Sequence, residues 1–170
     1  MTDNEKDLIM QLTLGSIDQG SFLKKFGKGL ESIPYYIHEN LKNALILEDA
    51  DFVEYGLLLG FNFSFPEKQD FINVLSSLLL QEWHYKHEDI ARILQKLKSP
   101  ESVDSLYQAV NTDYEYLEYN NCEALIVKCA YALGDINTEE AREKLRLMSE
   151  SDNEIIQEAG KKQLERIGSG

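Results

Sequence analysis

The chain has 170 residues, of which 43% are hydrophobic and 10% aromatic, so it can form a buried core and wholesale disorder is excluded. Three prolines and ten glycines favour helices over a loop-rich β architecture. The formal net charge of −13 makes nucleic acid a poor partner, because binding it requires clustered Lys and Arg, and it favours a basic protein partner.

The first half of the chain predicts short helices separated by glycines. Residues 4–13 and 21–26 are expected to be helical, and a helix over about 34–47 follows. Asp49 or Asp51 caps the next helix, and residues after Leu59 close it. The chain start lacks the basic residues and long apolar core of a signal peptide, and no segment is apolar enough to span a bilayer. We therefore expect no membrane association and a cytoplasmic location.

The second half predicts a regular succession of helices. A helix that opens at Pro66 leads to a corner at residues 83–89, and the next helix covers 90–97. Ser99-Pro100 then begins another helix, because a capping side chain followed by proline is a typical helix start.

The last third of the chain predicts stacked antiparallel helices, with a stop at the sequence GDIN and a capped restart at TEEA. An internal repeat pairs Leu97 with Leu133, 36 residues later, and Leu106 with Leu145. Leu164 begins a third copy, 31 residues after Leu133. Periods of this length, with two helices each, are typical of solenoids.

The pattern of helix, ALGDI, TEEA, helix, SDNE and helix resembles the HEAT repeat family. The resemblance covers about residues 66–167 and implies an all-α fold, a HEAT-like α-solenoid of antiparallel helix pairs, as a single domain over 1–170. Residues 1–65 would then be a helical cap or degenerate repeats, and 168–170 a tail. Such solenoids usually present a surface to a partner and carry no reaction centre.

The most unusual segment is TDYEYLEYNNCE at residues 112–123, an insertion that we expect to lie exposed between two helices. Tyrosines alternate there with acids, and no Lys or Arg occurs from Ser99 to Val127. Tyrosine gives a large contact area and is favoured at protein interfaces. The alternative is a solvated acidic face with some tyrosines packed under the loop. The candidate partner-binding residues are Asp113, Tyr114, Glu115, Tyr116, Glu118 and Tyr119.

The corner WHYKHED at residues 83–89 is the second unusual segment. Imidazoles beside carboxylates can hold zinc or iron, but the order differs from the H-E-x-x-H of a zinc protease. We therefore expect no metal. If these residues are exposed, they form a second partner-binding patch. Otherwise the tryptophan is buried between helices, and the histidines are hydrogen-bonded at the turn. The residues concerned are Trp83, His84, His87, Glu88 and Asp89.

No constellation of catalytic residues is evident. Cys129 occupies a small-residue position of a predicted helix and has no neighbouring base, and phosphate-binding or nucleophile-elbow motifs are missing. Cys122 and Cys129 lie seven residues apart on one predicted helix, about 10 Å, which is too far for a disulfide. We therefore expect neither an enzyme nor a cofactor, and a reducing compartment.

The segments WHxxHEDI, KLKSPESVDSLYQAV, YLEY and VKCAYALGDINTEEAREKL resemble a group of small bacterial HEAT-repeat proteins. Members of that group are similar to immunity proteins of polymorphic and contact-dependent growth-inhibition toxins. The resemblance covers about two thirds of the chain and implies a cytoplasmic protein that binds and occludes a cognate, basic toxin domain. Two alternatives stay open: a HEAT-repeat adaptor or assembly factor for another protein, and a HEAT-type enzyme.

Overall fold

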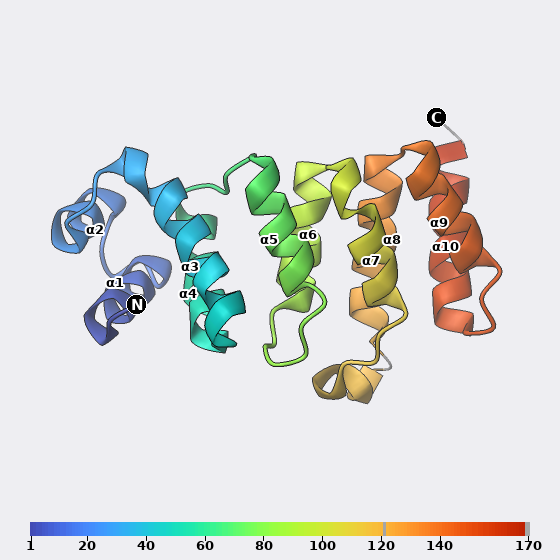
Figure 1. Cartoon of the computed structure of the whole chain (residues 1–170), viewed down its shortest axis with the longest axis horizontal. Coiled ribbons are helices and arrows are strands. Elements are labelled where there is room, and N and C mark those ends of the chain that lie inside the picture. The colour runs from blue at the N-terminus through green and yellow to red at the C-terminus, as the bar shows by residue number, and fades with distance from the viewer. Residues whose placement is uncertain (121, 169–170) are drawn as a thin grey trace. The chain divides into compact units, whose positions relative to one another are not determined.

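The computed structural model describes residues 1–120 and 122–168, without the side chains of 118–120. Over these residues the chain is all-α, with ten α-helices and no strand (Figure 1). It divides into two compact units, Met1–Val74 and Leu75–Gly170. The described part of the chain contains no helix with the length and apolarity needed to cross a membrane. The all-α fold is confirmed, while the single domain stays a prediction.

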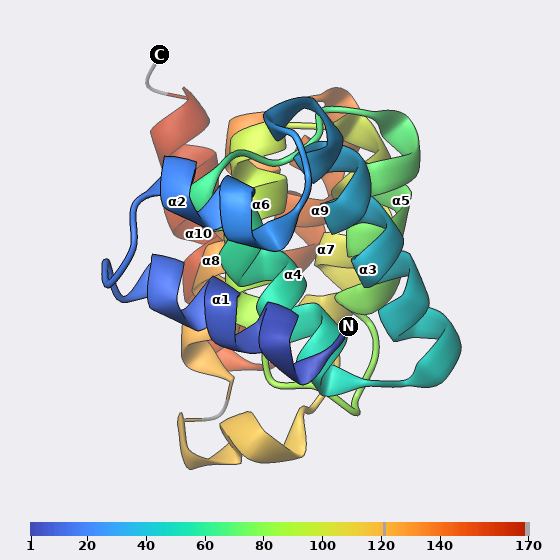
Figure 2. The ribbon, with the colours of Figure 1, turned by 90° about the vertical axis from the view of Figure 1, so that its left-hand side faces the viewer.

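Unit 1 contains four helices and the start of a fifth. In this unit α1 packs on α2 and α4, and α3 packs on α4 (Figure 2). The helix starts are set locally: the side chain of Thr2 accepts a hydrogen bond in a capping box, and Asp49 caps α4 as expected. Gly56 lies where α3 and α4 approach closely, and a Cβ there would lie 2.9 Å from the end of the Leu41 side chain. The helices are α1 Asp3–Thr13, α2 Gln19–Phe26, α3 Ile33–Leu47, α4 Ala50–Asn62 and α5 Gln69–Leu78, which crosses the unit boundary.

Unit 2 contains five further helices in a regular arrangement. Helix α8 packs between α6 and α10, and α7 and α9 both pack against it (Figure 1). The capped restart is confirmed, because the Thr138 hydroxyl accepts a hydrogen bond from the Ala141 amide. Cys122 lies outside α8, at its N-cap with φ 56°, so the prediction that both cysteines share one helix is wrong. The helices are α6 His87–Leu97, α7 Val103–Val110, α8 Glu123–Ile136, α9 Glu139–Ser149 and α10 Glu154–Gly168, with the 3-10 helices η2 Pro100–Ser102 and η3 Glu115–Asn120.

The helix ends correct the register of the internal repeat. Helices α6 and α8 both end at a residue in the left-handed region, Lys98 with φ 50° and Asn137 with φ 54°. Lys98 donates its amide hydrogen bond to Leu94, and Asn137 donates to Leu133. Leu94, and not Leu97, is therefore the counterpart of Leu133, and the helices repeat after 39 residues (98 to 137).

The buried positions of α6, α8 and α10 follow the same register. The buried positions of α8 match those of α10 at an interval of 30 residues. The interval between α6 and α8 is nine residues longer, and the insertion before α8 accounts for that difference. His87 occupies a position that is isoleucine in the other two helices, and Gln163 occupies a leucine position. The aligned sets are His87, Ile126 and Ile156; Ile90, Cys129 and Ala159; Ala91, Ala130 and Gly160; and Leu94, Leu133 and Gln163.

A polar network joins the C-terminal ends of these three helices. Gln95 on α6 donates to the Asp135 carboxylate at 2.7 Å, and Arg166 on α10 forms an ion pair with Asp135 at 2.8 Å. Burial opposes ionisation of Asp135, but the two donors outweigh it and hold the pKa of the carboxyl below its usual range. The network therefore fixes α6, α8 and α10 at one end of the unit.

Candidate functional site

The insertion is anchored by Tyr114, which the structure buries. Its side chain is 1% exposed, its ring centroid lies 3.9 Å from that of His87, and its hydroxyl donates to the Leu79 carbonyl at 2.7 Å. The prediction that Tyr114 is exposed is therefore wrong. The interior offers the phenol both an aromatic face and a hydrogen-bond acceptor, so burial leaves no polar group unpaired.

His84 and His87 are also fully buried and cannot form an exposed patch. His84 lies in the loop before α6 and His87 is the first residue of that helix, in agreement with the predicted corner. Their rings stack instead, with centroids 4.3 Å apart.

Hydrogen bonds determine which nitrogen carries the proton in each neutral imidazole. His84 Nε2 donates to the Leu78 carbonyl at 2.8 Å, and its Nδ1 accepts from the Lys86 amide at 3.1 Å. His87 Nε2 donates to the Gln81 carbonyl at 2.7 Å, and its Nδ1 accepts from the Tyr116 hydroxyl at 2.8 Å. A carbonyl only accepts, so each tautomer is determined.

Burial shifts the ionisation of these rings strongly. It lowers the pKa of His87 to about 4, and the neighbouring His84 adds to the effect while the bond to Gln81 partly offsets it. Burial also lowers the pKa of His84. The buried cluster of His84, His87 and Tyr114 is thus neutral at neutral pH and holds the insertion against the corner before α6.

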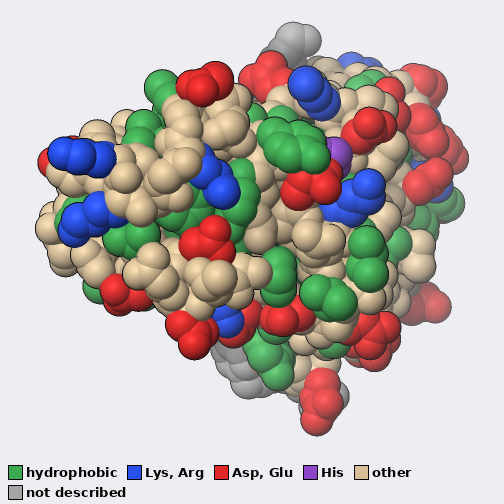
Figure 3. All heavy atoms as spheres, turned by 60° about the vertical axis from the view of Figure 1, so that its left-hand side comes forward, with side chains coloured by type: hydrophobic (Ala, Val, Ile, Leu, Met, Phe, Trp, Pro, Cys, Tyr) green, Lys and Arg blue, Asp and Glu red, His purple; other side chains and the backbone are tan. Residues whose placement is uncertain are grey.

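On the solvent side of this cluster, residues of the corner and of the insertion form one surface. A hollow of about 490 Å³ is lined by three exposed carboxylates and two tyrosines, Glu82, Tyr85, Asp113, Glu115 and Tyr116. The rings of Tyr85 and Tyr116 meet edge to face at 5.2 Å, and Tyr85 is 67% exposed. We call these five residues the acidic tyrosine surface. Figure 3 shows one face of the molecule, on which acidic, basic and hydrophobic side chains are interspersed.

The remaining predicted residues have other places. Trp83 is half-buried, lies edge-on to His84 and donates to the Gln81 side chain at 3.3 Å. Glu88 forms an ion pair with Lys128 of α8 at 2.6 Å, which reduces its availability to a partner. Asp89 is half-buried in the first turn of α6. The side chains of Glu118 and Tyr119 lie outside the described residues.

Sequence reasoning missed Glu82 and Tyr85 as surface residues. His84 and His87 turn inward on either side of Tyr85 and leave it on the solvent side, an arrangement that only the fold reveals. Nothing local in the sequence indicated that Tyr85 would meet Tyr116, about 30 residues away, because that contact depends on the tertiary fold.

The chemistry available at this surface is recognition of cations. Three carboxylates can accept hydrogen bonds from Lys or Arg, and a tyrosine face attracts a guanidinium or ammonium group. The described residues hold no group of three His, Cys, Asp or Glu suited to a metal. Burial raises the pKa of Cys129 to about 12, so that thiol is not a ready nucleophile. No known protein family, curated protein or solved structure matched the chain.

Proposed function

We propose that this chain is a HEAT-like repeat protein that acts in the cytoplasm as an immunity protein. In this proposal it binds a basic toxin domain and covers the positively charged surface on which that domain acts. The acidic tyrosine surface is the observation that carries the proposal: three exposed carboxylates and two tyrosines around one hollow.

Charge and rigidity both support such a role. The net charge of −13 would steer a basic protein toward the chain and speed association. Tyr116 is held in place, since its hydroxyl is bonded to His87 and the ring of Tyr114 is buried against the same imidazole. A surface that is ordered before binding loses less conformational entropy when the complex forms. The shared burial pattern of α6, α8 and α10 supports HEAT-like repeats.

The test compares two variants with the same change in charge. Glu82→Lys, Asp113→Lys and Glu115→Lys together reverse the acidic tyrosine surface. A control carries Glu140→Lys, Glu150→Lys and Asp152→Lys, which are exposed carboxylates elsewhere in unit 2. Each triple variant moves the net charge from −13 to −13 + 6 = −7, so a general charge effect cancels.

All three proteins are used as bait in the native host at moderate salt, and the captured proteins are identified by mass spectrometry. We expect the wild type and the control to retain one basic toxin-like domain, less tightly as salt rises, and the surface variant to lose it. Co-expression of that domain with the wild type should restore growth. Equal capture by the surface variant would refute the proposed site. Capture of a metabolic or secretion protein instead would favour the adaptor alternative.

A further inference from the structure

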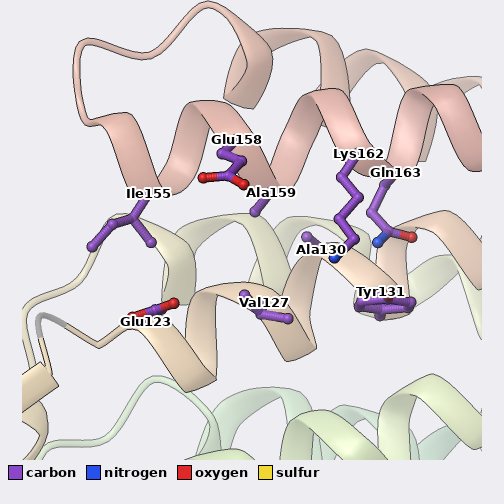
Figure 4. A pocket seen from close by; sticks show the side chains of 9 residues that line it. All are labelled: Glu123, Val127, Ala130, Tyr131, Ile155, Glu158, Ala159, Lys162 and Gln163. Atoms are coloured by element: carbon purple, nitrogen blue, oxygen red, sulfur yellow. The ribbon is translucent and has the colours of Figure 1, made fainter.

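A groove in unit 2 lies between α8 and α10 and shares no residue with the acidic tyrosine surface (Figure 4). It encloses about 150 Å³. Val127 and Ala130 of α8 and Ile155 and Ala159 of α10 form its apolar part. Alanines at two of these positions leave space that larger side chains would fill, and Val127 and Ile155 remain partly exposed at its sides.

The two ends of the groove carry opposite chemistry. Glu123 stands at one end and Tyr131 and Gln163 stand at the other, while Glu158 and Lys162 lie along the α10 side between them (Figure 4). Residues 123 and 131 are eight positions apart on α8, about 12 Å along its axis, and Glu158 and Lys162 are four positions apart on α10, about 6 Å.

The cationic end is held in a fixed geometry. Arg166 lies over the ring of Tyr131 at 5.2 Å, and its Nε donates to the Gln163 side-chain oxygen at 2.7 Å. A guanidinium only donates, so the Gln163 oxygen must face Arg166, and the amide nitrogen turns to the groove (Figure 4). Gln163 and Lys162 thus offer hydrogen-bond donors to the groove. Gln163 does so from a position that is leucine in α6 and α8.

The size of the groove excludes most small-molecule ligands. Sites for cofactors and drug-sized molecules typically enclose about 300–1,000 Å³. A volume of about 150 Å³ suits one aliphatic side chain. In an extended peptide, the residues on either side of that aliphatic residue lie about 7 Å apart. If their side chains are long, they cover the remaining distance between the two ends of the groove.

We propose that this groove is a docking site for a short extended segment of a protein partner with the order basic, aliphatic, acidic. The basic side chain pairs with Glu123 and Glu158, the aliphatic side chain lies over Ala130 and Ala159, and the acidic side chain meets Lys162. Charge complementarity to Glu123 and Glu158 on the one hand and to Lys162 on the other selects this occupant. The proposal does not depend on the immunity function, since it uses none of the residues of the acidic tyrosine surface.

The test is an NMR titration of the whole chain with the peptide acetyl-Arg-Leu-Glu-amide. We expect saturable shifts of the amides of Val127, Ala130, Ala159 and Gln163 at millimolar peptide. Replacing leucine by serine, or arginine by glutamate, should weaken binding at least tenfold, because each change removes one of the proposed contacts. Absence of saturable shifts, or equal affinity for the serine peptide, would overturn the proposal.

Matched variants separate this site from the proposed function. Glu123→Lys with Glu158→Lys should weaken binding of the peptide at least tenfold, while Glu140→Lys with Glu150→Lys should leave it unchanged. Ala159→Leu should block the groove, with the fold checked by thermal melting. The triple variant of the acidic tyrosine surface should bind the peptide normally. Loss of peptide binding in that variant would show that the groove is not an independent site.

Discussion

Acidification should weaken unit 2 through its buried histidines. An unfolded histidine has a pKa near 6.5, whereas burial lowers the pKa of His87 to about 4 and also lowers that of His84. Between these values the unfolded chain binds protons that the folded chain does not. The stabilisation is therefore complete above about pH 6.5 and is lost as the pH falls toward about 4.

The size of the effect follows from the difference between the two pKa values. For His87 alone, linkage between pH 7 and pH 5 gives a loss of about 2 kcal/mol, or about 30-fold in the unfolding equilibrium. His84 acts in the same direction, because its Nδ1 accepts a hydrogen bond that a proton would displace. Stacking at 4.3 Å also disfavours charge on both rings at once.

Urea unfolding at pH 7 and pH 5 measures this loss, with fluorescence of the single tryptophan as the signal. Trp83 lies 5.1 Å from His84, so it reports on this part of unit 2. His87→Gln should reduce the pH-dependent loss by about 2 kcal/mol relative to the wild type. Tyr116→Phe is the control: it should cost about 1–2 kcal/mol at both pH values and retain most of the pH dependence, because burial and not this hydrogen bond lowers the pKa of His87. A His87 NMR titration in the folded protein with its midpoint near 6.5 would refute the reasoning, even if His87→Gln fails to fold.

Two further predictions concern the interior of unit 2. Gly160→Ala should destabilise the protein by about 1–3 kcal/mol in urea unfolding, because its Cβ would lie 2.7 Å from a backbone nitrogen of α9. Gly134→Ala should cost less, since its Cβ would meet the side-chain ends of Arg166 and Gln163, at 2.5 and 2.9 Å, and no backbone atom, and an equal or larger cost would contradict this account. Cys129 is fully buried with its pKa raised to about 12, so its thiol should react with a disulfide reagent at pH 8 only after unfolding. Rapid labelling of Cys129 in the native protein would count against its burial.

The helix boundaries could be predicted because their signals are local. Asp49 and Thr138 cap helices by accepting hydrogen bonds from backbone amides two or three positions ahead. Helix α8 ends at Asn137, which adopts the left-handed conformation. The repeat register could not be fixed by matching leucines, because Gln163 fills a leucine position and Leu97 is only partly buried. Burial and the left-handed helix ends determine the register, and both require the fold.

The candidate site was predicted only in part. Alternating tyrosines and acids indicated an exposed face, and Asp113 and Glu115 are exposed. The pattern could not show that Tyr114 turns inward, because its partners are the Leu79 carbonyl and the ring of His87, which belong to distant residues. From the sequence we predicted two separate patches, at the corner and at the insertion, whereas tertiary contacts combine the two segments into one surface.

The choice of histidine at position 87 links the core to this surface. The equivalent positions of α8 and α10 are Ile126 and Ile156, so an aliphatic side chain suffices to close the interior there. A buried imidazole needs partners for both nitrogens, and it finds them in the Gln81 carbonyl and the Tyr116 hydroxyl. Those bonds are directional, so they fix the orientation of Tyr116 as apolar packing would not. The acid sensitivity is a consequence of the same arrangement, since the ring that orders the surface is also the one that burial keeps neutral.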